Sequence, residues 1–186
     1  MTQYEREVET PIGRIRIRVS DRGIEEVRFP GDGRRGDAGT GEHPLLERAA
    51  EELAEYFDGR RRSFSVPLAL SGTPFEQDVY RELVAIPYGE TRSYAAVAAR
   101  VARPRAARAV GAANGKNPLS LFVPCHRVVG ADGSLTGYAG GEESKRWLLA
   151  HERRVAARDP RMAPSNPPET PPISGSKSVR HRGQKR

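Results

Sequence analysis

Charged and apolar side chains alternate in the first part of the chain, as in the run Arg14-Ile15-Arg16-Ile17-Arg18-Val19. A period of two is typical of half-buried strands, and the glycines and prolines between such runs favour turns. We therefore predict three antiparallel strands over residues 3–9, 14–20 and 24–29. Residues 31–43 contain five glycines and no apolar pattern, which predicts a flexible loop.

A helical period replaces this alternation after Pro44. A proline suits the first turn of a helix and a glycine its end, so Pro44 and Gly59 delimit the predicted helix. The apolar positions at helical spacing are Leu46, Ala49, Ala50, Leu53, Tyr56 and Phe57. Three strands and one helix make residues 1–70 a small mixed α/β domain, which we expect to support the chemistry rather than carry it.

The second half, residues 71–156, is predicted to be mostly helical. Thr73-Pro74-Phe75-Glu76 is a capping box with proline at the first helical position. Ser93 suits the start of a second helix, and Ala102-Arg103 a turn after it. Pro104 then opens a helix from Arg105 to Asn114, with Gly115 at its end. Two short helices joined by a tight turn predict a helix-turn-helix.

The second helix of this pair has almost no large side chains. Arg105 and Arg108 are its only long ones, between alanines and Gly111. Such a helix can approach another backbone closely, and the sequence leaves open whether that backbone is protein or DNA.

The end of the chain contains a loop, a helix and a polar tail. Val128 to Thr136, with a turn at Asp132-Gly133, predicts a small hairpin or a tight loop. Glu142 opens a last helix, with its acidic side chain at the positive end of the helix dipole. Residues 157–186 hold six of the fifteen prolines and few apolar side chains, so we expect a disordered tail.

The distribution of charge along the chain indicates which class of molecule the protein binds. Lys and Arg exceed Asp and Glu by seven overall. Residues 1–70 carry 12 basic and 14 acidic side chains, residues 71–156 carry 12 and 8, and residues 157–186 carry 7 and 2. A basic excess on the second half and the tail suits a polyanion such as nucleic acid, although a solvated basic surface is common. The start of the chain is polar and no apolar run reaches membrane-spanning length, so we expect no signal peptide and no membrane span.

Cys125 is the only cysteine, so it can form neither an internal disulfide nor a thiolate zinc site. His126 and Arg127 follow it, and positive neighbours lower the pKa of a thiol and favour the reactive thiolate. A lone cysteine is also commonly a small buried hydrophobe, and Phe122-Val123 would suit a buried strand. The residues alone leave both interpretations open.

Seven motifs around Cys125 decide between them. They are Ile86-Pro87-Tyr88-Gly89-Glu90-Thr91, Ser93-Tyr94, Arg108-Ala109-Val110-Gly111, Asn117-Pro118, Pro124-Cys125-His126-Arg127-Val128, Gly137-Tyr138-Ala139-Gly140-Gly141 and Leu148-Leu149-Ala150-His151-Glu152. In this order and spacing the segment resembles the O6-alkylguanine-DNA alkyltransferases, also called methylated-DNA–protein-cysteine methyltransferases. The resemblance is dense over residues 73–154, looser over residues 1–70 and absent over residues 157–186.

The resemblance implies a fold and an activity. The fold is α/β (α+β): a small ribonuclease H-like amino-terminal domain, then a mostly helical domain with a helix-turn-helix. The activity is DNA repair, in which a methyl or other alkyl group moves irreversibly from O6-alkylguanine, and possibly O4-alkylthymine, to Cys125. The partner is double-stranded DNA containing alkylated guanine, bound through its minor groove with the base flipped out. We expect a cytoplasmic monomer, nucleoid-associated if bacterial, that acts once per molecule.

The resemblance also gives the catalytic residues their roles. Cys125 is the nucleophile, and His126 activates it through a bridging water, since neighbours on an extended strand would point apart. Glu152 lies four residues after Leu148, so its side chain turns partly toward the core, where a carboxylate needs a partner and would orient an imidazole. By residue type alone, His126 could be an ordinary strand histidine and Glu152 a surface acid. Asn117 is the family's hydrogen-bonding residue near the cysteine.

The remaining roles concern DNA and the base. Tyr94 is assigned to the phosphate and to the leaving-group side of the base, and Arg108 to the gap left in the stack. The backbone carbonyls of Cys125 and Val128 would contact the guanine amino group, and Tyr138 would help to form the pocket loop. Arg105 adds a DNA contact beside Arg108. Tyr94 could instead be a helix-start aromatic, and Arg108 a general phosphate contact.

The chain departs from the family at two points. Many members have serine where this chain has Ala139, which removes one hydroxyl donor to the base oxygen and leaves the backbone amide. Some members carry a zinc site built with cysteines, and with one cysteine and four scattered histidines we expect no metal and no cofactor.

Other functions remain as alternatives. The family's alkyltransferase-like branch recognises damage without accepting the alkyl group, but it has tryptophan at the position of Cys125. A transcription regulator would not need the histidine and glutamate, and a Cys–His hydrolase does not suit the motif order.

Overall fold

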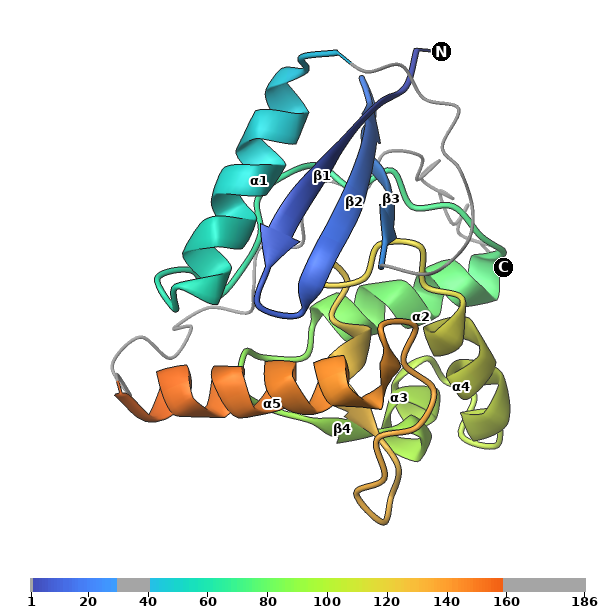
Figure 1. Ribbon diagram of the computed structural model, residues 1–186. Coiled ribbons are helices and arrows are strands. Elements are labelled where there is room, and N and C mark those ends of the chain that lie inside the picture. The colour runs from blue at the N-terminus through green and yellow to red at the C-terminus, as the bar shows by residue number, and fades with distance from the viewer. Residues whose placement is uncertain (1, 30–40, 159–186) are drawn as a thin grey trace, which may run out of the picture.

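The computed structural model describes residues 2–29 and 41–158. Its first half is a three-stranded antiparallel sheet with a helix against it (Figure 1). The strands are β1 (Tyr4–Thr10), β2 (Gly13–Ser20) and β3 (Gly23–Arg28), and the helix is α1 (Pro44–Phe57). All four elements predicted in this half are confirmed to within a residue or two.

Alternation along β2 separates the two faces of the sheet. Ile15, Ile17 and Val19 are fully buried. The arginines between them lie on the opposite face, where they pair with glutamates of β1 and β3, as Arg16 does with Glu7 at 2.9 Å. Since successive side chains of a strand point to opposite faces, one strand supplies both the core and a solvated ion-pair surface.

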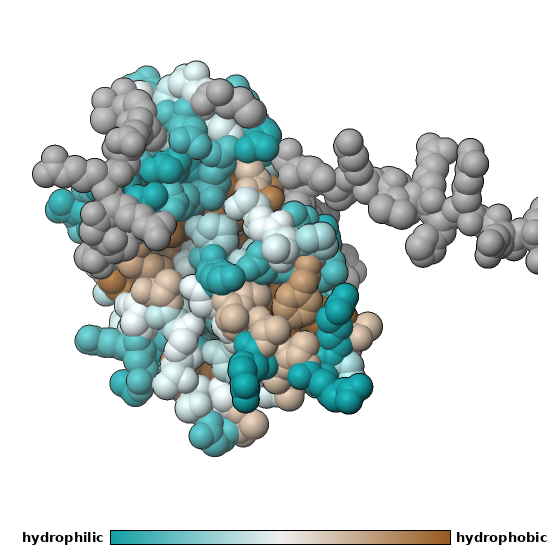
Figure 2. Space-filling model, turned by 90° about the vertical axis from the view of Figure 1, so that its right-hand side faces the viewer, coloured by the Kyte–Doolittle hydropathy of each residue, from teal (hydrophilic) through white to brown (hydrophobic). Residues whose placement is uncertain are grey.

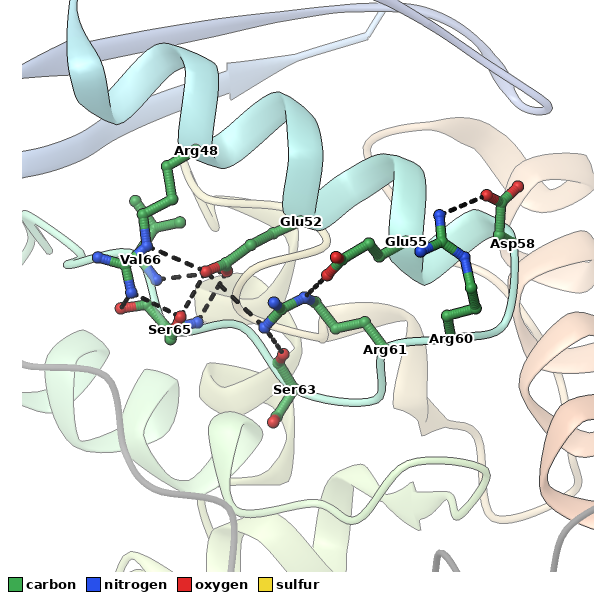
Figure 3. A network of polar contacts seen from close by, with 9 residues as sticks. All are labelled: Arg48, Glu52, Glu55, Asp58, Arg60, Arg61, Ser63, Ser65 and Val66. Carbon is green, nitrogen blue, oxygen red and sulfur yellow. Dashed lines mark hydrogen bonds and ion pairs between the residues drawn. The ribbon is translucent and has the colours of Figure 1, made fainter.

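A buried carboxylate fastens the segment after α1 to that helix (Figure 3). Glu52 is 3% exposed, and its carboxylate accepts hydrogen bonds from the backbone amide of Ser65 at 2.8 Å and from the Ser65 hydroxyl. Arg48 contacts the same carboxylate at 3.2 Å and Arg61 at 3.7 Å. These bonds satisfy a charge that would otherwise be costly to bury.

The chain then runs along the sheet and into the second half. The amide of Ile24 donates to Pro67 at 2.9 Å, and the amide of Val27 donates to Pro118 at 2.7 Å. The second bond joins the sheet to the loop that leads to Cys125. One continuous hydrophobic core extends through both halves of the described chain, from Ile15 to Val155.

The second half is mostly helical, as predicted. Its elements are α2 (Pro74–Val84), β4 (Arg92–Ser93), α3 (Tyr94–Arg100), α4 (Ala107–Gly115), a 3₁₀ turn η1 (Cys125–Arg127), β5 (Val128–Val129) and α5 (Gly141–Arg158). The capping box at Thr73 and the Ser93 cap are both confirmed, since each hydroxyl accepts the expected backbone amide. Helix α5 continues through Arg158.

The helix-turn-helix is present, but its second helix begins later than predicted. Pro104 and Arg105 lie in a turn, and α4 starts at Ala107 and runs through Gly115. The reason is the turn geometry: Ala102 has a φ of +57°, and the amide of Arg103 donates to Ala98 at 2.9 Å, which closes the end of α3. A second turn from Arg103 to Ala106 follows before the helix can start.

The expected extended strand at Cys125 is wrong, and of the two alternatives for residues 128–136 the tight loop is confirmed and the hairpin is not. Residues 125–127 form a 3₁₀ turn and not an extended strand, because the amide of Arg127 donates back to Pro124 at 3.0 Å. Val128 and Val129 pair with β4 in parallel and not with residues 135–136. The loop after β5 is tight, as expected, and is closed by the amide of Gly130 donating to Ser134 at 2.9 Å.

The surface over the helix-turn-helix combines small side chains with exposed arginines. Figure 2 shows this side of the molecule, where the lower half is pale and brown between a few teal side chains. The pattern agrees with α4, whose exposed residues include Ala109 and Ala112 as well as Arg108. A surface of small residues between arginines leaves the helix backbone accessible to a close partner.

Candidate active site

The candidate nucleophile, Cys125, opens the 3₁₀ turn and is 1% exposed. Its Sγ atom lies 3.7 Å from the hydroxyl of Ser120. Burial raises the pKa of the Cys125 thiol, while hydrogen bonds from Asn117 and Ser120 and the charge of Lys145 oppose that rise. The expectation that neighbouring positive charge lowers this pKa was wrong in its net direction, because desolvation outweighs the charges.

The loop before Cys125 is strained, and Asn117 holds it. Leu121 has a φ of +77°, a backbone conformation that residues other than glycine rarely adopt. The Asn117 amide donates to the carbonyl of Val123 at 2.9 Å, and its oxygen accepts the amide of Leu119 at 3.0 Å. Asn117 therefore bridges both ends of the loop that positions the thiol, beside its contact with the thiol itself.

The next residue, His126, is fully buried and faces a carboxylate. Its Nε2 atom lies 2.8 Å from Oε1 of Glu152, and its Nδ1 atom is buried with no hydrogen-bond partner in residues 2–29 and 41–158. Burial lowers the pKa of His126, and the charge of Glu152 opposes that lowering. A carboxylate oxygen accepts, so Nε2 carries the proton and the neutral ring presents a lone pair at Nδ1.

Glu152, on α5, is the most heavily hydrogen-bonded carboxylate in the described chain. Arg127 donates to both of its oxygens, at 2.9 Å each, and the amide of Gly89 donates to Oε2 at 3.0 Å. The hydroxyl of Tyr56 donates to Oε1 at 2.7 Å. Burial would raise the pKa of Glu152, but the charges and hydrogen bonds of Arg127 and His126 hold it well below its usual range. This group is therefore ionised at neutral pH.

Two tyrosines lie near enough to Cys125 to be influenced by its charge. Tyr94, at the start of α3, is half-buried, and its hydroxyl donates to the carbonyl of Thr136 at 3.1 Å. Burial, and then the charge of Cys125, raises the pKa of Tyr94. Tyr138 is 8% exposed, its ring centroid lies 6.3 Å from that of His126, and its hydroxyl is buried with no hydrogen-bond partner among the described residues. Burial, and then the charge of Cys125, also raises the pKa of Tyr138, so both phenols are protonated at neutral pH.

The other predicted site residues have less direct connections to the thiol. Val128 is buried directly after the 3₁₀ turn, and Ala139 is exposed on the loop beside Tyr138. Arg108 is exposed in the first turn of α4, and Arg105 is exposed in the turn that precedes this helix. The structure thus groups Cys125, His126, Glu152, Asn117, Tyr94 and Tyr138 together, with the two arginines on the adjacent helix-turn-helix surface.

Sequence reasoning missed several neighbours of this cluster. Arg127 stood in the motif but was assigned to the thiol, whereas its guanidinium contacts Glu152 and the carbonyl of Ile86 at 2.7 Å. Lys145 is fully buried, its Nζ atom has no partner in the described chain, and burial lowers its pKa while the charge of Cys125 opposes this. Its spacing of seven residues before Glu152 puts both on one face of α5, a signal that the sequence did contain. Asn114, which donates to the carbonyl of Cys125 at 3.4 Å, had no such signal.

Neither a metal site nor a membrane span is found in the part of the chain that the structure describes. Residues 2–29 and 41–158 contain no group of three or more His, Cys, Asp or Glu side chains that could hold an ion. No helix within those ranges is long and apolar enough to cross a bilayer.

Comparison with known proteins gives two family matches that together cover most of the chain. Residues 4–70 match the ribonuclease-like domain of 6-O-methylguanine DNA methyltransferase, and residues 74–154 match the DNA binding domain of the same family.

Individual relatives agree with these matches. A constitutive methylated-DNA–protein-cysteine methyltransferase of Bacillus subtilis is 56% identical over 113 residues, which is 60% of this chain and 68% of the relative. A methylated-DNA–protein-cysteine methyltransferase of Mycolicibacterium paratuberculosis is 46% identical over 157 residues, or 83% of this chain and 94% of the relative. The crystal structure of OGT from Mycobacterium tuberculosis in complex with DNA is 42% identical, with a TM-score of 0.75, and covers 82% of this chain and 94% of that one.

Proposed function

The chain belongs to the 6-O-methylguanine DNA methyltransferase family, and from that premise we propose the roles of its individual residues. It is a methylated-DNA–protein-cysteine methyltransferase, and we propose that it moves an alkyl group from O6-alkylguanine in DNA to its own Cys125. One observation carries the proposed mechanism. Cys125, the only thiol of the chain, is followed by the buried imidazole of His126, whose Nε2 atom donates to the ionised carboxylate of Glu152.

Activation of the thiol is the first step. Because burial raises the pKa of Cys125, a base must take its proton. His126 is that base: with Nε2–H held by Glu152, Nδ1 is the atom that accepts. We propose that a water molecule bridges the ring and Sγ, as the relay of the family implies. Glu152 stabilises the imidazolium that forms, as the third member of the relay.

The alkyl transfer is a displacement at carbon. The thiolate of Cys125 forms the S–C bond while the C–O6 bond breaks, and the electron pair of that bond goes to O6 of guanine. A proton must then reach the leaving base. Tyr94, a protonated phenol beside the thiol, donates it, and the backbone amide at Ala139 provides the hydrogen bond that a serine supplies elsewhere in the family. The product thioether is a poor leaving group, so each molecule reacts once.

Substrate binding uses the helix-turn-helix. The small side chains of α4 suit close approach to a minor groove, and Arg105 and Arg108 face the phosphates and bases there. Arg108 fills the gap in the stack when the alkylated guanine rotates toward Cys125. The carbonyl of Val128 contacts the guanine amino group, with Tyr138 forming the side of the pocket. The carbonyl of Cys125, assigned to the same amino group, also accepts from Asn114 in this structure.

The remaining proposals concern the oligomeric state and the cellular location of the protein. We propose a monomer, since each reaction consumes one chain and one set of side chains forms the site. A working thiol requires a reducing compartment, which supports the cytoplasm as its location.

Intact mass spectrometry tests the nucleophile. The protein is mixed with a duplex containing one O6-methylguanine, and a gain of one methyl group that maps to Cys125 is expected. Cys125→Ser should show no gain while its binding to the damaged duplex persists. Methylation of the serine variant, or of another residue in the parent protein, would overturn the assignment.

A further inference from the structure

The amino-terminal half contacts the proposed relay directly. Tyr56 lies on α1, is 1% exposed, and its hydroxyl donates to Oε1 of Glu152 at 2.7 Å. No other hydrogen bond from residues 4–70 to the Cys125, His126 and Glu152 side chains is present in the described chain. This single bond spans 96 positions of sequence.

Helix α5 holds Tyr56 at two points. Nε2 of His151 donates to the backbone carbonyl of Tyr56 at 2.9 Å, while the next residue, Glu152, accepts from its hydroxyl. The Tyr56 ring also packs against Phe64 and Tyr88, at centroid distances of 5.4 and 5.9 Å. The hydroxyl is therefore aimed by backbone and ring contacts together, and it has little freedom to turn away.

The oxygen that Tyr56 contacts is the one that faces the imidazole. Oε1 of Glu152 accepts from Tyr56 and from His126 at 2.7 and 2.8 Å. Arg127 donates to the same oxygen at 2.9 and 3.2 Å. Donors on one oxygen share its negative charge, so removal of the bond from Tyr56 changes how much charge His126 meets. A donor on Oε1 thus acts on the basicity of the His126 ring without touching the ring.

We infer that Tyr56 is a positioning residue of the transfer reaction, through which the amino-terminal domain orients Glu152 and limits the charge that this carboxylate presents to His126. The inference rests on the proposed function of His126 as the base. It assigns the first half of the chain a defined part in the chemistry, beyond support.

Other charged and titratable groups also influence His126 and Glu152, and the effect of Tyr56 adds to theirs. Burial, and then the charge of Glu152, raises the pKa of Tyr56 well above its ordinary value, so its hydroxyl stays a donor. The groups that act on His126 or Glu152 from the neighbouring elements are Arg127, Lys145, Tyr88 and Tyr138.

Tyr56→Phe tests the inference, because it keeps the ring and removes only the hydroxyl. With one donor fewer on Oε1, more negative charge faces the imidazole, and the pKa of His126 should rise by about half a unit. The rate of methyl transfer to Cys125 at neutral pH should fall roughly five- to tenfold as Glu152 loses a hydrogen bond that orients it. The first quantity is read from the ring resonances of His126 by NMR, and the second from a single-turnover time course.

Tyr88→Phe is the matched control. Its hydroxyl is buried in the same aromatic cluster and faces Glu152, but it has no hydrogen-bond partner in the described chain, so its removal should shift both readouts less than Tyr56→Phe does. An unmoved His126 pKa in a folded Tyr56→Phe protein, or an equal shift in Tyr88→Phe, would overturn the inference.

A second variant tests the inference if Tyr56→Phe folds poorly. Site-specific 3-fluorotyrosine at position 56 is nearly isosteric and a stronger donor, so it should lower the His126 pKa, and the absence of any shift would contradict the inference. Different results would contradict the proposed mechanism and the proposed role of Tyr56. A parent protein that does not methylate Cys125 refutes the mechanism, while the His126 titrations decide the role of Tyr56 regardless.

Discussion

A single carboxylate, that of Glu152, joins more parts of this molecule than any other side chain described above. It accepts hydrogen bonds from α1, from the loop before β4 and from the 3₁₀ turn, through Tyr56, Gly89, His126 and Arg127. Burying a charge is costly unless donors replace its water. Here they do so fully, which makes the residue as important for folding as for the proposed chemistry.

The first prediction is a pH-dependent loss of stability in Glu152→Gln. The folded-state pKa of Glu152 lies below its unfolded value of about 4.3, so its contribution is complete above that value and is lost as pH falls toward the folded pKa. At pH 7 the variant should unfold with a free energy about 3–5 kcal/mol lower than the parent, because it leaves Arg127 buried without its counter-charge. Urea unfolding at neutral pH and at steps below pH 5 should show this gap narrowing.

Glu142→Gln is the control for that experiment. Glu142 pairs with Arg146 at 2.6 Å, but both side chains are more than half exposed, so its replacement should change stability by less than about 0.5 kcal/mol. A gap for Glu152→Gln that is equally large at every pH would mean that packing, and not ionisation, explains the loss.

At the scale of elements, the helix pair α3 and α4 combines a strained turn with an exposed surface that we propose contacts DNA. Ala102 occupies a left-handed conformation at the end of α3, a position that glycine adopts without strain. The surface of α4 carries Arg108 in its first turn, after Arg105 in the preceding turn. The two features give one prediction each.

Ala102→Gly should stabilise the protein by about 0.5–1 kcal/mol, since it relieves the positive φ. The matched control is Ala99→Gly, the same substitution at an exposed position three residues earlier inside α3. There it should destabilise by about the same amount, because glycine gives up more conformational freedom in a helix. Chemical denaturation of both variants measures the opposite signs, and equal signs would contradict the strain at Ala102.

Arg108→Ala should separate base flipping from chemistry. Methyl transfer from a damaged duplex at saturating protein should fall about tenfold or more, while reaction with the free O6-methylguanine base should be little changed, because only the duplex requires extrusion. Arg105→Ala removes the same charge from the same surface, and its effect on the duplex should disappear at high protein concentration. Equal losses on duplex and free base would show that Arg108 does not fill the stack.

At the scale of the whole molecule, charge is divided between halves that share one core. The amino-terminal half is slightly acidic and the second half is basic, yet hydrophobic packing is continuous from Ile15 to Val155. Attraction to DNA therefore concentrates on the half that carries Cys125. The predicted basic tail, residues 157–186, lies outside the described residues except for 157 and 158, which belong to α5.

Truncation after Arg158 tests the role of that tail. The removed segment carries six Lys or Arg and two Asp or Glu, so undamaged duplex should bind more weakly and with a flatter dependence on salt. The melting temperature and the transfer rate should stay nearly unchanged. Binding of full-length and truncated protein to undamaged duplex at two salt concentrations measures the effect, and identical affinities at low salt would mean that the tail does not contact DNA.

Local patterns in the sequence determined the elements and the identity of the reacting groups. Alternation around Ile15 and Ile17 predicted the sheet, and the caps at Thr73 and Ser93 predicted two helix starts, because such signals act through neighbouring backbone groups. The lone thiol and the motif order pointed to Cys125, and the spacing after Leu148 turned Glu152 toward the core. Their catalytic roles remain proposals.

Only the tertiary structure decided what surrounds those groups. The pairing of β5 with β4 and the burial that raises the thiol pKa both depend on segments distant in sequence. Arg127 and Tyr56 meet at Glu152 for the same reason. Desolvation and the convergence of donors are properties of a packed interior, and no local run of residues specifies which distant side chains will share it.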